Sequence, residues 1–371
     1  MHWPRIALVA PSLETLGGQG VQARVLAGAL RNEGHAVTFL PFNPKFPARL
    51  QWVRRYPYVR TLLNQSLYLP SLIRLRRADV AHVFSASYWS FLLSPLPAIV
   101  VGRLMGKRVV LNYHSGQAED HLSQWGMLVH PWLRLVDEIV VPSVYLRNVF
   151  ARYGYRALVI PNVVDTSRFR YRERSPLRPH LLSTRNLESF YQVDNTLEAF
   201  ALLKARYPDA TLTVAGSGSE EGRLRRLAAS LGVGGIRFVG PVKPPAIPSL
   251  YEQADIFVNS SVVDNQPLSV LEAFASGLPV VSTGTGDIAA MVRDGETGLI
   301  VPQGDAAAMA KAMTSLLENQ DLALGMARRA KQESEQYTWP CVREQWAAVY
   351  SNRCHHHSHT PDSVRATASE R

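Results

Sequence analysis

The chain has 371 residues, with 40 Lys and Arg against 30 Asp and Glu, and 46% of its residues are hydrophobic. That length predicts about two domains, and the hydrophobic content excludes a disordered chain. Two cysteines, Cys341 and Cys354, are too few for a disulfide framework or a four-thiolate metal site, so a reducing compartment fits.

Positive charge is concentrated in the N-terminal half. Residues 1–178 contain 23 Lys and Arg against 9 Asp and Glu, whereas the remaining residues contain 17 against 21. We therefore expect the N-terminal half to face something anionic. Nucleic acid, an anionic membrane and a phosphorylated substrate each satisfy the charge pattern alone. Nucleic acid is disfavoured because no recognised binding module occurs in the sequence.

No segment is predicted to cross a membrane. The apolar run at 6–10 is too short for a signal-peptide core. Residues 80–102 contain no Asp, Glu, Lys or Arg, a length that could span a bilayer. His82, Pro95 and Pro97 break this stretch into a strand and a helix, so we interpret it as buried core.

The first half of the chain alternates strands and helices. A strand at 6–10 is followed by the glycine turn Gly17-Gly18-Gln19-Gly20 and a helical pattern through Leu30. A strand–helix–strand order predicts a parallel sheet. The strands expected in this half are 6–10, 36–40, 80–84, 108–112, 138–142 and 157–160.

The alternation restarts after a charged, proline-containing linker at 169–179. The sequence therefore predicts an α/β fold with two doubly wound domains facing a cleft, at 1–168 and 180–336. A closing helix at 337–350 follows them. The strands expected in the second half are 180–183, 210–215, 236–239, 255–259 and 279–282, and the helices are 195–206, 220–231, 247–254, 267–276 and 305–319.

The last residues, 351–371, are polar and are predicted to be disordered. They include His355-His356-His357 and His359 beside Cys354. A solvated tail is favoured over a metal site, because no partner ligands flank these histidines at a structural spacing.

Residues 255–282 carry the chemistry. The pattern predicts a buried strand, a loop at 260–266 and a helix with Pro267 in its first turn, ending at Gly277. Asn265 or Gln266 would precede or cap this helix, whose N-terminus favours a phosphate. Asp264 and Glu272 would then lie near the phosphate site, where carboxylates suit sugar hydroxyls. On spacing alone, capping for Asp264 and solvation for Glu272 are equally good interpretations.

This segment resembles the motif of retaining glycosyltransferases of family 4, which have the GT-B fold. That motif has two acidic residues with seven between them, followed by E-A-x-A-x-G-x-P-V-V, and residues 272–281 match it throughout. Asp264 replaces the usual first Glu. Further matches are Gly17-Gly18, 34–38, 113–115, 141–143, 160–165, 215–218, 237–240, 297–301 and 337–339.

The resemblance implies a retaining hexosyltransferase that needs no metal or cofactor and uses a UDP- or GDP-sugar. Arg185 would stabilise the leaving diphosphate, Asp264 would contact the donor sugar and Glu272 the ribose. His114 would bond the donor sugar or the reaction centre. The donor-binding residues implied are Gly17, Gly18, Gly216, Ser217, Gly240, Asn265, Gln266, Pro267, Leu268 and Ser269.

Val163 stands where the family usually has Gly, but one other departure from the family pattern matters more. The family has a Lys-Gly pair shortly after the arginine, but Tyr191-Gln192 stands there in this chain. A phenol cannot neutralise a phosphate. Either Arg185 and the helix N-terminus suffice, or another residue contributes, with Lys243 the nearest downstream lysine.

The stretch 49–77 combines arginines with aromatic residues and predicts contact with an anionic membrane. We therefore expect a glycan or lipid-linked acceptor, a cytoplasmic protein and peripheral membrane attachment. The stretch contains Arg49, Arg54, Arg55, Arg60, Arg74, Arg76 and Arg77 with Trp52, Tyr56, Tyr58 and Tyr68.

Two other functions stay open: a GT-B sugar-nucleotide epimerase and a non-catalytic sugar-nucleotide-binding subunit.

Overall fold

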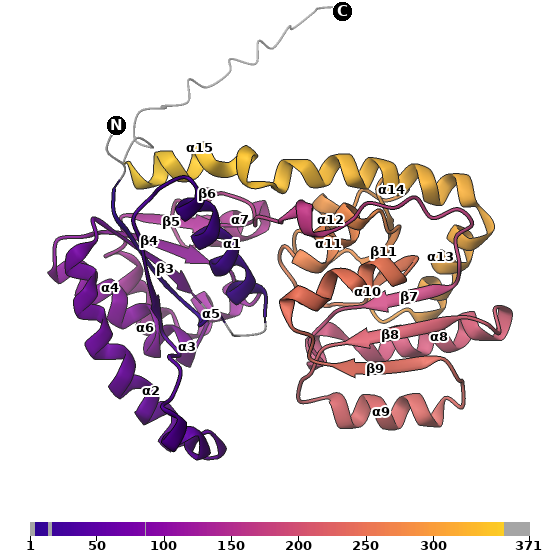
Figure 1. The fold of residues 1–371 in the computed structure, drawn as a ribbon, viewed down its shortest axis with the longest axis horizontal. Coiled ribbons are helices and arrows are strands. Elements are labelled where there is room, and N and C mark those ends of the chain that lie inside the picture. Colours follow the sequence, from indigo (N-terminus) through magenta and orange to yellow (C-terminus); the bar gives the residue numbers. More distant parts are fainter. Residues whose placement is uncertain (1–3, 14–16, 86, 352–371) are drawn as a thin grey trace, which may run out of the picture.

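The computed structural model describes residues 4–13, 17–85 and 87–351. Two α/β domains lie side by side, each built on a six-stranded parallel sheet (Figure 1). The proposed disordered tail, with its histidines and Cys354, lies outside the described residues. Among the described helices, none combines the length and apolar composition that crossing a bilayer requires.

The first sheet has the strand order β2-β1-β3-β4-β5-β6, and apolar clusters cover both of its faces. Its strands are β1 (Ile6–Ala10), β2 (Val37–Pro41), β3 (Val80–Ser85), β4 (Arg108–Tyr113), β5 (Glu138–Val141) and β6 (Leu158–Val159). Its helices are α1 (Gly18–Asn32), α2 (Pro57–Ser71), α3 (Trp89–Leu93), α4 (Pro95–Leu104), α5 (Ala118–Gln124), α6 (Gly126–Leu133) and α7 (Val144–Arg152).

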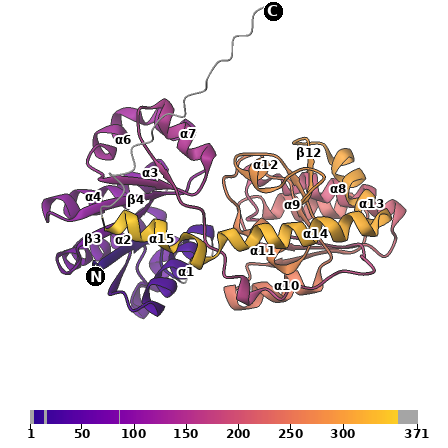
Figure 2. The same cartoon turned by 90° about the horizontal axis from the view of Figure 1, so that it is seen from above.

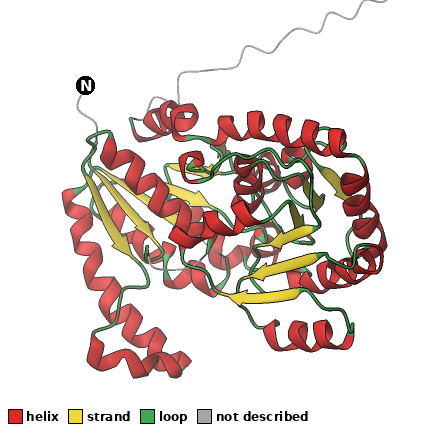
Figure 3. Cartoon of the chain, turned by 45° about the vertical axis from the view of Figure 1, so that its right-hand side comes forward, coloured by secondary structure: helices red, strands yellow, loops and turns green. Residues whose placement is uncertain are grey.

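The second sheet has the order β12-β11-β10-β7-β8-β9. Its strands are β7 (His180–Ser183), β8 (Thr211–Ala215), β9 (Ile236–Gly240), β10 (Ile256–Asn259), β11 (Val280–Thr283) and β12 (Leu299–Val301). The helices that follow are α8 (Val193–Arg206), α9 (Glu221–Ser230), α10 (Ile247–Gln253), α11 (Leu268–Ser276), α12 (Ile288–Met291), α13 (Ala306–Glu318), α14 (Gln320–Ser334) and α15 (Trp339–Tyr350). Helices flank the strands of both sheets (Figure 3).

Every strand expected from the sequence is present, with each end within one residue of its predicted position. Strand β12 and helices α12 and α14 were not predicted. Helices α14 and α15 run end to end along both domains (Figures 1 and 2). Val342 and Trp346 of α15 pack in the same cluster as Ile6 and Leu8 of β1, so the end of the chain returns to the first sheet.

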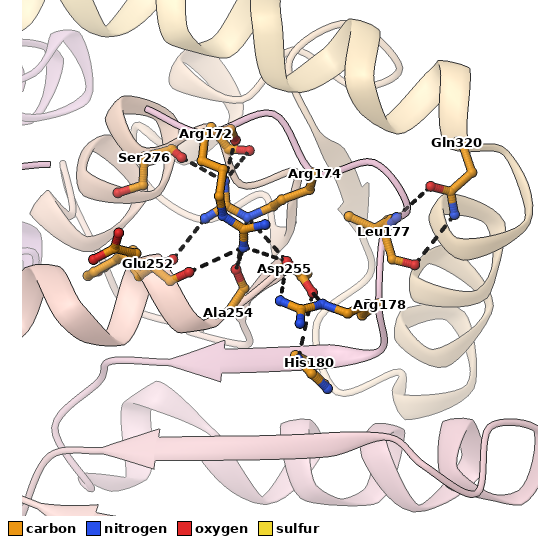
Figure 4. Close-up of polar contacts among 12 residues, drawn as sticks. Arg172, Arg174, Leu177, Arg178, His180, Glu252, Ala254, Asp255, Ser276 and Gln320 are labelled. Carbon is orange, nitrogen blue, oxygen red and sulfur yellow. Dashed lines mark hydrogen bonds and ion pairs between the residues drawn. The ribbon is translucent and has the colours of Figure 1, made fainter. Parts of the chain in front are cut away.

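The segment between the sheets is fastened to the second domain by arginines (Figure 4). Arg172 and Arg178 form ion pairs of 2.8 and 2.7 Å with the fully buried Asp255. Arg174 is itself buried and donates to the carbonyl oxygens of Tyr251 and Ala254, both at 2.8 Å. Burial is the main cause that lowers the pKa of Arg174 to about 10. These bonds fix where the chain enters β7 and hence where the residues after β7 lie.

Candidate active site

A cleft of about 530 Å³ lies between the domains, where the parallel strands of both sheets end. Gly17 and Gly18 line it after β1, His114 after β4 and Arg185 after β7. Ligands of doubly wound sheets bind at such carboxyl ends. Of the site residues expected from the sequence, only Gly240 is not in the cleft lining, and its neighbour Pro241 takes that place.

The N-terminus of α11 opens into the cleft, one residue later than expected. Pro267 is the N-cap rather than a first-turn residue, and Leu268 begins the helix. No side chain caps this end, so Asn265 and Gln266 do not perform the capping proposed for them. Leu268 and Ser269 line the cleft, so uncapped backbone N–H groups lie at its wall.

Arg185 is held at the centre of this wall. Its Nη1 donates to Ser269 Oγ at 3.1 Å, and its Nη2 pairs with Asp264. The ring of Tyr191 lies against its guanidinium, 4.1 Å from Cζ to the ring centroid. The residue is 8% exposed, and its buried Nε has no partner. The guanidinium is thus oriented from two sides and keeps N–H donors for a ligand.

Glu272 lies in α11, about one helical turn after the start of the helix. Its Oε2 accepts a hydrogen bond of 2.8 Å from the hydroxyl of Tyr251, which is also 2.8 Å from Thr184 Oγ1. Removal from water is the main cause that raises the pKa of Glu272 to about 7, although the Tyr251 hydrogen bond lowers it. This carboxyl group therefore titrates near neutral pH while it faces the cleft.

His114 lies on the opposite wall. Its ring stacks on Phe84, with centroids 5.3 Å apart and planes 10° apart. Removal from water lowers its pKa to about 4, so the imidazole is neutral at physiological pH. Its buried Nε2 has no partner. A neutral imidazole with a free ring nitrogen can bond a sugar hydroxyl without placing a second cation in the cleft.

Asn265 and Gln266 join the two domains. Asn265 accepts a hydrogen bond from Ser143, and Gln266 Oε1 accepts one of 2.6 Å from the backbone N–H of Asn162. Both also line the cleft. They hold the walls together directly beside Asp264, a function that the sequence analysis did not assign to them.

Close backbone approach explains two glycines of the lining. A β-carbon on Gly116 would lie 3.3 Å from the carbonyl oxygen of Asp264, across the cleft. A β-carbon on Gly216 would lie 2.1 Å from the carbonyl oxygen of Arg185. Any larger residue at Gly216 would displace the strand end that positions Arg185.

Two residues at this site were missed by the sequence analysis. Arg168 lines the cleft but was assigned only to the end of the first domain. Tyr251, which has no motif to mark it, is fully buried outside the lining and donates to Glu272. Lys243, considered as a second cation, is exposed and outside the lining. Within the described parts of the chain, no three His, Cys, Asp or Glu side chains gather as metal ligands.

Two family models match consecutive parts of the chain. The description "Glycosyltransferase Family 4" matches residues 16–168, and "Glycosyl transferases group 1" matches residues 167–333. Together with the paired sheets and their cleft, these matches define a GT-B glycosyltransferase. The second domain matches the group 1 glycosyltransferases and the first matches family 4, which confirms the resemblance seen in the sequence.

Two relatives illustrate the range of similarity. Phosphatidyl-myo-inositol mannosyltransferase of Mycolicibacterium smegmatis is 27% identical over 93% of both chains. D-inositol 3-phosphate glycosyltransferase of Corynebacterium urealyticum is 36% identical, but the match covers 42% of this chain and only 38% of that protein.

Solved structures show the same fold. Anabaena HepE in complex with UDP-glucose has a TM-score of 0.75 at 16% identity, covering 94% of this chain and all of that one. Sucrose-phosphate synthase of Thermosynechococcus elongatus has a TM-score of 0.74 at 19% identity, covering 94% and 99%.

Proposed function

We propose that this chain transfers a sugar from a nucleotide diphosphate sugar to a glycan or lipid-linked acceptor, with retention of anomeric configuration. One observation carries the proposal: Arg185, the uncapped start of α11 and two carboxyl groups meet in the cleft between the domains. A guanidinium and helix N–H groups suit a leaving diphosphate, and carboxylates suit sugar hydroxyls.

The leaving diphosphate is the group on which charge develops during transfer. Arg185 is already oriented by Ser269 and Tyr191, so its guanidinium is positioned to stabilise that charge. When the diphosphate pairs with the Arg185 guanidinium, the ion pair with Asp264 is broken. The Asp264 carboxylate then accepts hydrogen bonds from the donor sugar. Glu272, held by Tyr251, accepts from the ribose hydroxyls in its ionised form.

Retention of the anomeric configuration requires the acceptor to approach the anomeric carbon on the same face as the leaving group. The departing phosphate can itself take the acceptor proton, so the mechanism needs no separate base. His114 is neutral and lies across the cleft from Asp264, where it bonds the donor sugar.

The acceptor is proposed to be reached at an anionic cytoplasmic leaflet. The α2 region, residues 48–77, extends from the first domain on the side away from α15 (Figure 1). It exposes Tyr58 to 92% and Leu62 to 73%. The exposed arginines here form no ion pair with a described carboxylate; they are Arg49, Arg55, Arg60, Arg74, Arg76 and Arg77. The named lipid substrate of the mannosyltransferase relative supports a lipid-linked acceptor.

Tyr68 does not belong to this surface. It is fully buried, and its hydroxyl donates to the carbonyl oxygen of Ser94 at 2.6 Å. The aromatic side chains left to meet a bilayer are Trp52, Tyr56 and Tyr58, all exposed. Amphipathic aromatic rings of this kind lie at the headgroup level of membranes.

A non-catalytic sugar-nucleotide-binding subunit is the second candidate, because Tyr191 stands where the family carries a cation. Incubation with a panel of UDP- and GDP-sugars, followed by detection of free nucleoside diphosphate, separates the two. Release from at least one donor supports the transferase, whereas binding without release supports the subunit. An epimerase would instead yield an isomeric nucleotide sugar.

A further inference from the structure

We propose that Arg168 supplies the second positive charge that holds the donor diphosphate, replacing the lysine that is absent at Tyr191. The inference deepens the proposed function and rests on it. Arg168 ends the short helical turn Thr166–Arg168 between the two sheets, a segment that neither the acidic motif nor the glycine turns include.

Arg168 faces the same cleft as Arg185. Among the described residues that line the cleft, Arg168 and Arg185 are the only ones with a Lys or Arg side chain. The Arg168 Nη2 donates to the carbonyl oxygen of Pro244, another lining residue, and its Cζ lies 5.8 Å from the Phe169 ring centroid. The half-buried side chain is therefore fixed against the cleft wall rather than free in solvent.

The two arginines differ in how their charge is balanced. Arg185 is paired with Asp264, whereas no described carboxylate lies within ion-pairing distance of Arg168. Burial raises the pKa of Glu272, and among the cations that oppose this shift Arg168 acts more strongly than Arg185. The uncompensated positive charge of the cleft is thus that of Arg168, close to the carboxyl group assigned to the ribose.

Other sources for this charge are absent from the described cleft. Tyr191 occupies the position of the family lysine, but it covers the face of Arg185 and burial raises the pKa of its phenol. Lys243 is exposed and does not line the cleft. A nucleotide diphosphate sugar carries two phosphate charges, and Arg185 supplies only one positive charge to meet them.

Calorimetric titration with UDP and with GDP tests this inference. Arg168→Gln keeps an amide donor for Pro244 and removes the charge, and Arg168→Ser is a second neutral variant of different size. We expect each to bind the nucleotide that the wild type prefers at least about tenfold more weakly. Arg168→Lys retains the charge and should bind the nucleotide more tightly than either neutral variant.

The matched control is Arg170→Gln, two residues away, whose side chain is 84% exposed and should be silent. The affinity of the wild type should also fall more steeply with salt than that of Arg168→Gln, since one phosphate contact is lost. Equal affinity of the wild type and both neutral variants overturns the inference and leaves the proposed function intact. A wild type that binds neither nucleotide overturns the proposed function itself.

Discussion

The two walls of the cleft differ in charge and in how their side chains are held. The C-terminal wall contains Arg185, Asp264 and Glu272, each engaged by a neighbour from a different element. The N-terminal wall offers glycine backbone and the neutral ring of His114. The exposed arginines of the α2 region lie on the first domain, outside the cleft lining.

This contrast assigns a partner to each domain. A preorganised cationic wall suits the diphosphate donor, because its groups need no reorganisation when charge develops. An uncharged wall leaves room for an acceptor, and the exposed basic surface of the same domain can bring that acceptor from a membrane. Five predictions test this account, in order of expected effect.

Loss of the central cation should have the largest effect. Arg185→Ala removes the guanidinium and leaves Asp264 without its partner, so we expect kcat/KM for donor turnover to fall about 10²- to 10³-fold. The control is Arg152→Ala, whose exposed pair with Glu119 is 2.6 Å long and should contribute little. Steady-state kinetics that place Arg185→Ala within threefold of the wild type would remove Arg185 from the site.

Membrane attachment should depend on the first domain. The triple variant Arg74→Gln, Arg76→Gln, Arg77→Gln removes three exposed charges, each contributing about 1 kcal/mol at an anionic surface, so vesicle affinity should fall about 100-fold. The matched control neutralises Arg225, Arg226 and Arg237 on the second domain. Sedimentation with anionic and neutral vesicles measures both, and equal losses, or binding indifferent to anionic lipid, would contradict the membrane proposal.

Donor affinity should depend on the ionisation of Glu272. Because its pKa is raised to about 7, affinity for a nucleotide sugar should rise as pH increases from 6 to 8. Glu272→Gln and Glu272→Ala should abolish this rise and weaken binding about 10- to 100-fold at pH 8. A nucleotide sugar is preferable to UDP, whose terminal phosphate titrates near pH 6. Calorimetry that shows parallel pH profiles for the wild type and Glu272→Gln would exclude this role.

The same group has the opposite effect on stability. Its pKa in the folded state is above the ordinary value of 4.5, so the folded chain binds the proton more tightly. Its contribution to the free energy of unfolding is therefore largest below about pH 4.5 and is lost as pH rises to about 7. Chemical denaturation should show this loss in the wild type and not in Glu272→Gln.

Chelation should have the smallest effect. The carboxyl groups of the cleft are committed to Arg185 and Tyr251, and no metal-ligand cluster occurs among the described residues. Activity in EDTA should therefore equal activity without it. Complete loss on chelation that Mg²⁺ or Mn²⁺ restores would mean that a metal, rather than the arginines, neutralises the diphosphate.

The sequence predicted the strands well because their apolar runs are local and bounded by glycine and proline. All but one of the site residues that it named line the cleft, since parallel strands end at one edge. The sequence could not predict contacts between distant residues, because these depend on tertiary packing. Examples are the stacking of Tyr191 on Arg185, the hydrogen bonds by which Asn265 and Gln266 join the domains, and the burial of Tyr68. The domain boundaries and the roles of the individual site residues remain predictions.

The most direct test follows the anomeric proton of the sugar by NMR during turnover of an active donor. The account predicts that nucleoside diphosphate appears together with a product whose first-formed anomeric configuration is that of the donor. An inverted first product would contradict the retaining mechanism. An isomerised nucleotide sugar with no free diphosphate would contradict sugar transfer by this cleft.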